Sequence, residues 1–497
     1  MRFLYIDIDT LRADHLGCYG YHRNTSPNID ALAAEGVRYE NVYASDVPCL
    51  PSRTALSTGV FGIRNGVINH GGVAADLRHE GKNRRFFGAV ANNSWASKFY
   101  WAGWHTASIS SFPFRHSASW WNHGVMEAMN LMRGFGGERA DEVLPGALDW
   151  LDRRGAADNW FLHLHLWDPH TPYNTPEEYG NPFADDPVPD WHTDAVREHN
   201  WGLAGPHSAQ EPWGFSPDEW GTPPPRQPWN ASDMDAVKGI FDGYDVGIRY
   251  ADDAVGTVMN KLADMGILDD TAVLISSDHG EAFGELGVYA DHQGADEATC
   301  HIPSILKWPG VEPRVYSGLH YHLDIAATVV DLAEIPIPTH YWSGESTKPA
   351  LNEGTDEGRD VLFLSQGAWS CQRGVRWGDN LYLRTWHDGY HPHWNDEMLF
   401  NIADDPHEQT DLAADEPALV SEAAGLLSDW TEAQVARGIG GITDDPMDIV
   451  LDEGGPLHVR GHLPAYLDRL RETGRSQWAD KLIDRFPVDA QPAGASE

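Results

Sequence analysis

The sequence predicts an α/β sandwich around a large, mostly parallel central sheet, followed by a smaller α+β domain with a short antiparallel sheet. Four short apolar runs end in polar residues, as buried parallel strands do at the carboxyl edge of a sheet. Helical patterns lie between these runs, for example at 248–267, where apolar residues recur every three or four positions. Strands that alternate with helices favour a parallel sheet. The four runs are residues 3–9 (FLYIDID), 105–112 (HTASISSF), 160–170 (WFLHLHLWDPH) and 271–281 (TAVLISSDHGE).

The chain of 497 residues divides by composition into several regions. Residues 1–355 contain the alternating pattern and are expected to form one large domain. An insertion at 174–230 is rich in Pro, Trp, Asp and Gly, and so long a loop is usually functional or a lid. Three short strand patterns predict a smaller α+β subdomain over 356–440. Residues 441–497 are expected to form a helical extension.

Composition excludes several classes of partner. A net charge of −40 argues against binding of nucleic acid or of anionic membranes, so an anionic substrate needs local positive charge. The four cysteines, Cys18, Cys49, Cys300 and Cys371, are too few and too scattered for a disulfide scaffold. The sequence shows neither a secretory leader nor a membrane span, which predicts a cytoplasmic protein.

Acidic residues at two predicted strand ends suggest a metal site. Asp7 and Asp9 lie two apart on one strand and therefore point to the same face, while Asp278 and His279 close another strand. Oxygen-rich ligation favours a hard cation such as Ca²⁺ or Mg²⁺. The alternative is that each aspartate caps a loop or the next helix.

Histidines follow or occupy one of these strands. His170 sits in DPHTPY, where two prolines stiffen the loop, and an imidazole held in this way can act as a general acid or base. The alternative for a single loop histidine is an ordinary surface residue. His163 and His165 alternate along the strand itself and are expected to be packing residues.

The segment DVPCLPSRTALSTG, residues 46–59, predicts a helix that begins next to a cysteine. Pro51 suits the first turn of a helix, and the glycine that closes the segment suits its end. Free backbone N–H groups at a helix start attract tetrahedral anions and lower the pKa of a thiol, here that of Cys49. Arg53 adds a forked donor one turn later. The alternative is a buried structural cysteine.

Together these motifs resemble the type I sulfatases of the alkaline phosphatase superfamily. The resemblance covers most of residues 1–415 and includes DTLRADHLGCYG, DPHTPY, SSDHGE and MLFNIADDPHEQTDLA. It implies an alkaline-phosphatase-like fold with a catalytic domain at 1–355. The family signature, Cys-x-Pro-Ser-Arg followed by Thr-Gly, reads here Cys49, Leu50, Pro51, Ser52, Arg53 and then Thr58-Gly59.

The resemblance also implies a mechanism. In this family a separate maturation enzyme oxidises the signature cysteine to Cα-formylglycine, whose hydrate attacks the sulfur of a sulfate ester. A covalent sulfate hemiacetal then collapses to aldehyde and free sulfate, and a divalent cation neutralises the sulfate oxygens. The implied roles are Cys49 as nucleophile precursor and metal ligand, Arg53 as support of the hydrate and the metal shell, Asp9, Asp278 and His279 as metal ligands, and His170 as the acid that protonates the leaving alcohol.

Three departures from the family pattern affect the candidate metal ligands and anion-binding residues. The second of two adjacent acids is missing after Asp9, which leaves Asp7 as an alternative ligand. The usual lysine-containing segment is replaced by SISSFPFRHSA, so Arg115 and His116 are the candidates for its anion-binding and proton-transfer roles. The family's second, sulfate-binding lysine is also missing, and His292 is the candidate for its role. Because histidine is charged only when protonated, these replacements predict a lowered pH optimum, and a rate still rising above about pH 9 would contradict this.

Two other functions stay open at this point. Related enzymes hydrolyse phosphonate or phosphate mono- and diesters with the same nucleophile, and a non-catalytic glycan-binding relative would never mature. The tryptophans of the insertion either stack on the sugar rings of a sulfated carbohydrate or pack at the interface of a homo-oligomer. These tryptophans are Trp191, Trp201, Trp213, Trp220 and Trp229.

Overall fold

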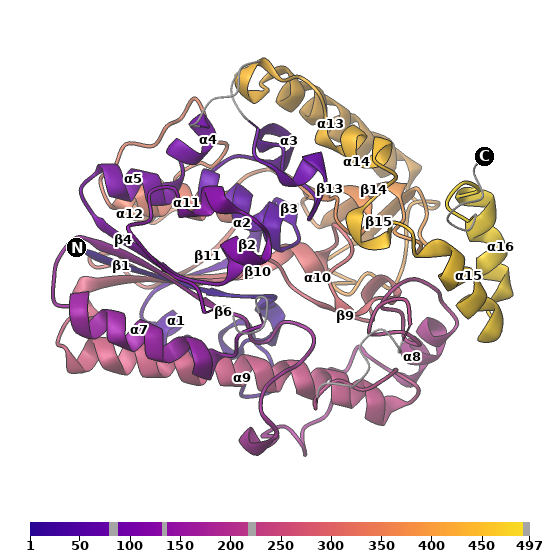
Figure 1. The fold of residues 1–497 in the computed structure, drawn as a ribbon, viewed down its shortest axis with the longest axis horizontal. Coiled ribbons are helices and arrows are strands. Elements are labelled where there is room, and N and C mark those ends of the chain that lie inside the picture. Colours follow the sequence, from indigo (N-terminus) through magenta and orange to yellow (C-terminus); the bar gives the residue numbers. More distant parts are fainter. Residues whose placement is uncertain (79–87, 132–136, 217–224, 491–497) are drawn as a thin grey trace.

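The computed structural model describes residues 1–78, 88–131, 137–216 and 225–490, and it shows a central sheet with helices on both faces (Figure 1). Strands β7, β1, β6, β4 and β5 run parallel, whereas β10 pairs antiparallel with both β7 and β2. The predicted large, mostly parallel sheet is therefore confirmed. Its eight strands, in spatial order, are β11 (Arg314–Tyr321), β2 (Val37–Tyr43), β10 (His301–Lys307), β7 (Thr271–Ser276), β1 (Arg2–Ile8), β6 (Trp160–Leu166), β4 (His105–Ile109) and β5 (Glu127–Met129).

Each face of β1 is buried against its own set of helices. Phe3 and Tyr5 belong to one core, and Leu4 and Ile6 belong to another, as expected for a strand whose side chains alternate between two covered faces. The first core includes residues of α5 (Trp95–Trp101) and α11 (His322–Leu332). The second includes residues of α1 (Pro27–Ala34), α7 (Ala140–Arg154) and α9 (Met234–Asp264).

The long helix α9 forms for local reasons that the sequence shows. The side chain of Asp233 caps its first turn by accepting a hydrogen bond from the backbone N–H of Ala236 at 2.8 Å. Apolar residues then recur on the face that is buried against the sheet, including Val237, Ile240 and Tyr244. No helix in the described residues is long and apolar enough to cross a bilayer.

The smaller sheet contains two strands that the sequence did not predict. The three predicted strands are antiparallel, β15 joins them as a fourth antiparallel strand, and α13 (Pro417–Ala436) packs against this sheet. The fifth, β3, pairs parallel with β12 through only two residues, too few for a strand pattern in the sequence. This pairing holds the chain just before Cys49 against the smaller sheet. The strands are β15 (Glu397–Asn401), β14 (Asn380–His387), β13 (Cys371–Trp377), β12 (Val361–Gln366) and β3 (Asp46–Val47).

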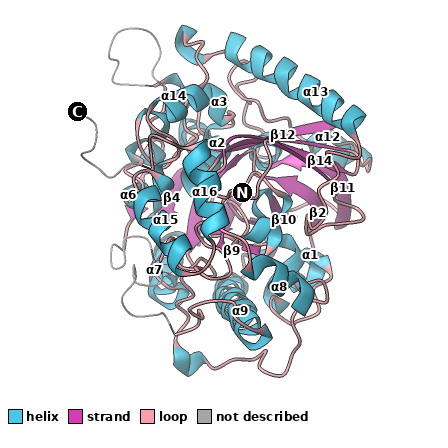
Figure 2. Cartoon of the chain, turned by 90° about the vertical axis from the view of Figure 1, so that its right-hand side faces the viewer, coloured by secondary structure: helices cyan, strands magenta, loops and turns pink. Residues whose placement is uncertain are grey.

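The C-terminal segment packs on the insertion. Tyr466 lies on α15 (Leu463–Glu472), and its hydroxyl donates to the carbonyl of Gly205 at 2.9 Å. Glu211 of the insertion accepts from Arg469 at 3.0 Å. Helices α15 and α16 (Ser476–Arg485) lie at the end of the molecule that carries α8 (Asp194–Trp201), and they face the viewer in Figure 2. Preceding them, α14 (Pro446–Asp452) contacts β13 of the smaller sheet.

Candidate active site

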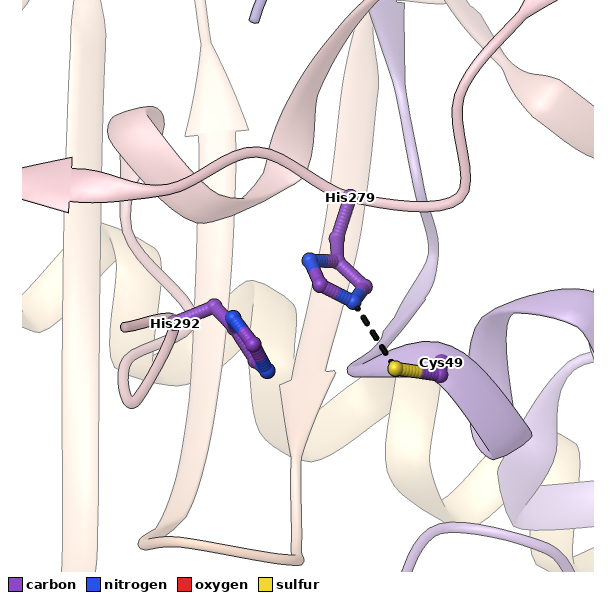
Figure 3. Close-up of side chains that lie close together, drawn as sticks. All are labelled: Cys49, His279 and His292. Carbon is purple, nitrogen blue, oxygen red and sulfur yellow. Dashed lines mark hydrogen bonds between the residues drawn. The ribbon is translucent and has the colours of Figure 1, made fainter. Parts of the chain in front are cut away.

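Two strand ends and one helix start meet at Cys49. Asp9 follows β1, Asp278 and His279 follow β7, and Cys49 is the first residue of α2 (Cys49–Thr58). One potential ligand atom from each of these four residues lies within 4.8 Å of those from the others, and all four residues are buried. Figure 3 shows the Cys49 sulfur facing the imidazole of His279, 3.2 Å from Nε2. The structure thus brings together residues that are far apart in the sequence.

The donor atoms in this group suit a divalent cation. Nδ1 of His279 lies 2.9 Å from the carbonyl oxygen of Gly280, so this nitrogen carries the proton and the Nε2 lone pair is left to face Cys49. Among the described residues, Oδ1 of Asp9 is buried and has no hydrogen-bond partner. A buried carboxylate oxygen without a donor is costly unless a cation occupies its vicinity. Two carboxylates and an imidazole fit Ca²⁺, Mg²⁺ or a similar ion.

Arg53 links this group to a third carboxylate. Its Nη1 donates to Oδ2 of Asp278 at 2.6 Å and lies 3.1 Å from Oδ2 of Asp9. Its Nε donates to Oδ2 of Asp7 at 2.7 Å. Although burial opposes ionisation, the charge of Arg53 holds the pKa values of Asp7 and Asp9 below their usual range. Asp7, the alternative ligand, lies outside the group of four and instead anchors Arg53.

His163 and His165 do more than the packing role predicted for them. Nε2 of His165 lies 3.1 Å from Oδ2 of Asp9, and Nε2 of His163 lies 3.3 Å from Oδ2 of Asp7. Strand β6, which carries both histidines, pairs with β1 in a register that sets Asp7 opposite His165. Their spacing of two residues was the available signal, because it matches that of the two aspartates. The pairing of the two strands could not be read from the sequence.

A cavity of about 760 Å³ opens onto Cys49. Three other predicted residues, Arg115, His170 and His292, also line it. The ring centroid of His292 is 4.1 Å from that of His279 and 5.3 Å from that of His170. A cavity of this size that ends at a buried polar group is typical of a small-molecule site.

His116 is not among the residues that line the cavity. Its ring packs edge-on against that of His70, which is a lining residue, with centroids 4.8 Å apart. Sequence reasoning missed His70 and its partner His458, whose ring nitrogens lie 2.8 Å apart. His458 comes from the C-terminal extension, and no local pattern marks it as a cavity residue.

The insertion supplies further residues that sequence reasoning did not identify. His207 lies 2.7 Å from Asp291, and both line the cavity together with Trp213, one of the predicted tryptophans. The other tryptophans of the insertion have different positions. Trp191 stacks on His407, Trp201 packs against the core that contains α9, Trp229 contacts Trp213, and Trp220 lies outside the described residues.

Arg115 carries the positive charge of the cavity wall. Burial lowers the pKa of His170 to about 3 and also lowers the pKa values of His116 and His292, so these imidazoles are neutral at pH 7 before an anion binds. Burial lowers the pKa of Arg115 too, but a guanidinium remains charged. Its Nη1 is buried without a hydrogen-bond partner among the described residues. An incoming anion would therefore meet a donor that no protein group satisfies.

Buried neutral histidines predict a loss of stability in acid. Burial lowers the pKa of His322 and of His387 to about 4, below the unfolded value of about 6.5, so the unfolded chain binds protons first as pH falls. Carboxyls with a raised pKa, such as Asp46 (about 6) and Asp168 (about 7), act in the opposite direction. Among the described residues, however, histidines with a lowered pKa are more numerous than carboxyls with a raised pKa. Each such imidazole is expected to remove about 2 kcal/mol or less from the free energy of unfolding at pH 5.

Thermal unfolding at pH 7.5 and pH 5, with a chelator present so that metal release does not contribute, measures this effect. The melting temperature is expected to be lower at pH 5. An unchanged or higher melting temperature at pH 5 would contradict the neutral state of these histidines.

Comparison with known proteins identifies the family. The sulfatase family profile matches residues 2–335, which is more than half of the chain. The uncharacterized sulfatase YidJ of Escherichia coli is 25% identical over 368 residues, covering 68% of each chain. Choline-sulfatase of Rhizobium meliloti is 25% identical over 447 residues, covering 80% of this chain and 79% of the relative.

Solved structures show the same fold. A protein in complex with its substrate D-glucosamine-2-N,6-O-disulfate matches with a TM-score of 0.68 at 19% identity, covering 87% of this chain and 97% of that one. Phosphonate monoester hydrolase of Agrobacterium radiobacter also matches with a TM-score of 0.68 at 19% identity, covering 87% and 95%. The predicted alkaline-phosphatase-like architecture is thus confirmed. With the family profile covering both strand ends and the start of α2, the chain belongs to the sulfatase family of sulfuric ester hydrolases.

Proposed function

We propose that this protein hydrolyses a sulfate ester of a carbohydrate, with residue 49 acting as Cα-formylglycine beside a bound divalent cation. The expected cation is Ca²⁺, and Mg²⁺ or another divalent ion is the alternative. The observation that carries the proposal is the position of Cys49. It lies at the start of α2, where a cavity ends, within reach of Asp9, Asp278 and His279. The exposed fraction of Cys49 is 1%, so a maturation enzyme would have to act before α2 packs into the fold.

Each part of the site has a chemical role in this proposal. The aldehyde hydrate at position 49 would supply the nucleophilic oxygen, and the cation would neutralise charge on the sulfate. Asp9, Asp278 and His279 would hold the cation, while Arg53 orients both carboxylates. Nδ1 of His170 contacts the carbonyl of Thr171 and therefore carries the proton of the neutral ring. Nε2 would protonate the leaving alcohol once the bound anion has favoured the imidazolium form of His170.

The cavity wall supports a carbohydrate as the leaving group. Aromatic side chains stack on sugar rings, and the cavity is lined by Phe114, Trp213, Phe215 and Trp369. Its volume of about 760 Å³ falls in the range that holds a small ligand. A protein of the same fold has a sulfated glucosamine as its substrate, which is consistent with this class.

Phosphonate or phosphate ester hydrolysis is the second candidate function. The observation that favours it is the equal TM-score of 0.68 with a phosphonate monoester hydrolase. Both anions are tetrahedral, and the groups around Cys49 do not by themselves distinguish sulfur from phosphorus. Assays of the mature protein on aryl sulfate, aryl phosphonate and a panel of sulfated mono- and oligosaccharides are expected to give the highest kcat/KM for a sulfated sugar. A higher value for the phosphonate would select the second function.

Phe114 tests the carbohydrate part of the proposal. Its side chain lines the cavity yet is 55% exposed, so its removal should leave the fold intact. Replacement Phe114→Ala is expected to raise KM for the preferred sulfated sugar about fivefold while changing kcat little, because a stacking contact is lost. Trp101→Ala is the matched control, because Trp101 is exposed but does not line the cavity. Equal KM values for both variants would count against a sugar at this wall.

A further inference from the structure

We propose that Trp167 is a positioning residue that holds the anion-binding guanidinium of Arg115 and the acid His170 in one stacked unit. Trp167 follows β6 directly and is 6% exposed on the cavity wall. Cζ of Arg115 lies 3.8 Å from the centroid of its ring. The imidazole of His170 stacks on it with centroids 4.0 Å apart and an interplanar angle of 22°. The inference rests on the proposed function for the roles of Arg115 and His170.

The contact with Arg115, which is half-buried, differs from the contacts that three fully buried arginines make. Arg12, Arg23 and Arg53 each pair with a buried carboxylate at 2.9 Å or less. Arg115 has no carboxylate partner among the described residues, and its Nη1 makes no hydrogen bond there. A carboxylate would cancel the charge that a substrate anion needs. An indole face stabilises the cation through its quadrupole and leaves the N–H donors available.

The contact with His170 explains how the acid is oriented. One ring nitrogen of His170 contacts the carbonyl of Thr171, which fixes one direction of the ring. The stack with Trp167 fixes its plane. The same indole packs edge-on against the ring of His165, with ring centroids 6.4 Å apart, and His165 in turn contacts Asp9. Loss of the indole would therefore disturb anion binding and proton transfer together.

Inorganic sulfate is the probe for the anion-binding part, because its binding requires no turnover. Calorimetry on the mature, metal-loaded protein is expected to show that Trp167→Leu raises the dissociation constant for sulfate about 10-fold. Trp167→Phe is expected to raise it about threefold. Arg115→Gln is expected to weaken binding at least as much as Trp167→Leu. The double variant should bind no more weakly than Arg115→Gln alone, because the indole acts through that guanidinium.

A matched control separates this role from the general loss of a tryptophan. Trp191 stacks on His407 with centroids 4.0 Å apart and an interplanar angle of 13°, but neither residue lines the cavity. Trp191→Leu should therefore leave sulfate binding unchanged. Trp167→Phe keeps an aromatic face and serves as the test variant if Trp167→Leu does not fold.

Kinetics test the contact with His170. With a sulfate ester as substrate, Trp167→Leu is expected to lower kcat and to raise KM. It should also shift the alkaline limb of the plot of kcat against pH. Arg115→Gln should mainly raise KM. The inference is overturned if wild-type protein does not bind sulfate, if Trp167→Leu binds it normally, or if the two replacements are additive. An unshifted alkaline limb would overturn the part that concerns His170. Normal sulfate binding without turnover of any sulfate ester would instead overturn the proposed function.

Discussion

Replacement of Cys49 by alanine is expected to reduce sulfate-ester hydrolysis by at least about 10⁴-fold. Alanine cannot be converted to the aldehyde, so the nucleophilic oxygen would be absent while the cavity, Arg53 and the carboxylates remain. The side chain is buried and small, so the change should leave the fold largely intact. Initial rates with the preferred sulfate ester, measured together with melting temperature and metal content, check this prediction.

Two other buried cysteines provide matched controls for this replacement. Cys300 and Cys371 are free and fully buried, but neither lines the cavity. Their alanine variants are expected to retain wild-type kcat within about twofold, even if stability falls by about 1 to 2 kcal/mol. Retained turnover in Cys49→Ala would show that another group supplies the nucleophile.

The second large effect is expected at Asp9. Replacement Asp9→Asn removes the charge of the one carboxylate in the group of four potential ligands that has a buried oxygen without a hydrogen-bond partner among the described residues. It should therefore weaken cation binding and lower kcat/KM about 10³-fold. Treatment with a chelator should give a similar loss, and added Ca²⁺ or Mg²⁺ should restore the activity of the wild-type protein. Metal content by mass spectrometry and activity as a function of added cation measure both effects.

Asp7 is the informative control, since it is equally buried and lies at the end of β1, just before Asp9. It accepts two hydrogen bonds from Arg53 and lies outside the group of four potential ligands. Asp7→Asn should keep the bound metal while lowering activity through a less well-held Arg53. If Asp7→Asn loses the metal and Asp9→Asn retains it, the assignment of the two aspartates is reversed.

Local sequence patterns predicted the parts of the site that lie at strand ends and at the helix start. Asp9 follows β1, Asp278 and His279 follow β7, and Cys49 begins α2; parallel strands bring such ends to one edge of a sheet. The pattern alone could not separate Asp9 from Asp7, because residues two apart on a strand point to the same face. In the folded chain they differ because Asp7 accepts two hydrogen bonds from Arg53, whereas Asp9 belongs to the group of four potential ligands.

The remainder of the site depends on contacts between distant segments, which local periodicity does not encode. His458 reaches the cavity because the C-terminal extension packs on the insertion. Strand β3 consists of two residues and exists only through its pairing with β12. Trp167 gave no signal as a site residue, since an apolar side chain after a strand is ordinarily part of the core. Its contacts with Arg115 and His170 became visible only in the folded chain.

The central claim is that residue 49 performs its chemistry as an aldehyde and not as a thiol. Mass spectrometry of the peptide that contains residue 49, in protein coexpressed with a maturation enzyme, measures this directly. The account predicts a peptide about 18 Da lighter than the cysteine form, and a rate of sulfate-ester hydrolysis that rises in proportion to the converted fraction. Full hydrolytic activity in protein whose Cys49 remains an unmodified thiol would contradict it.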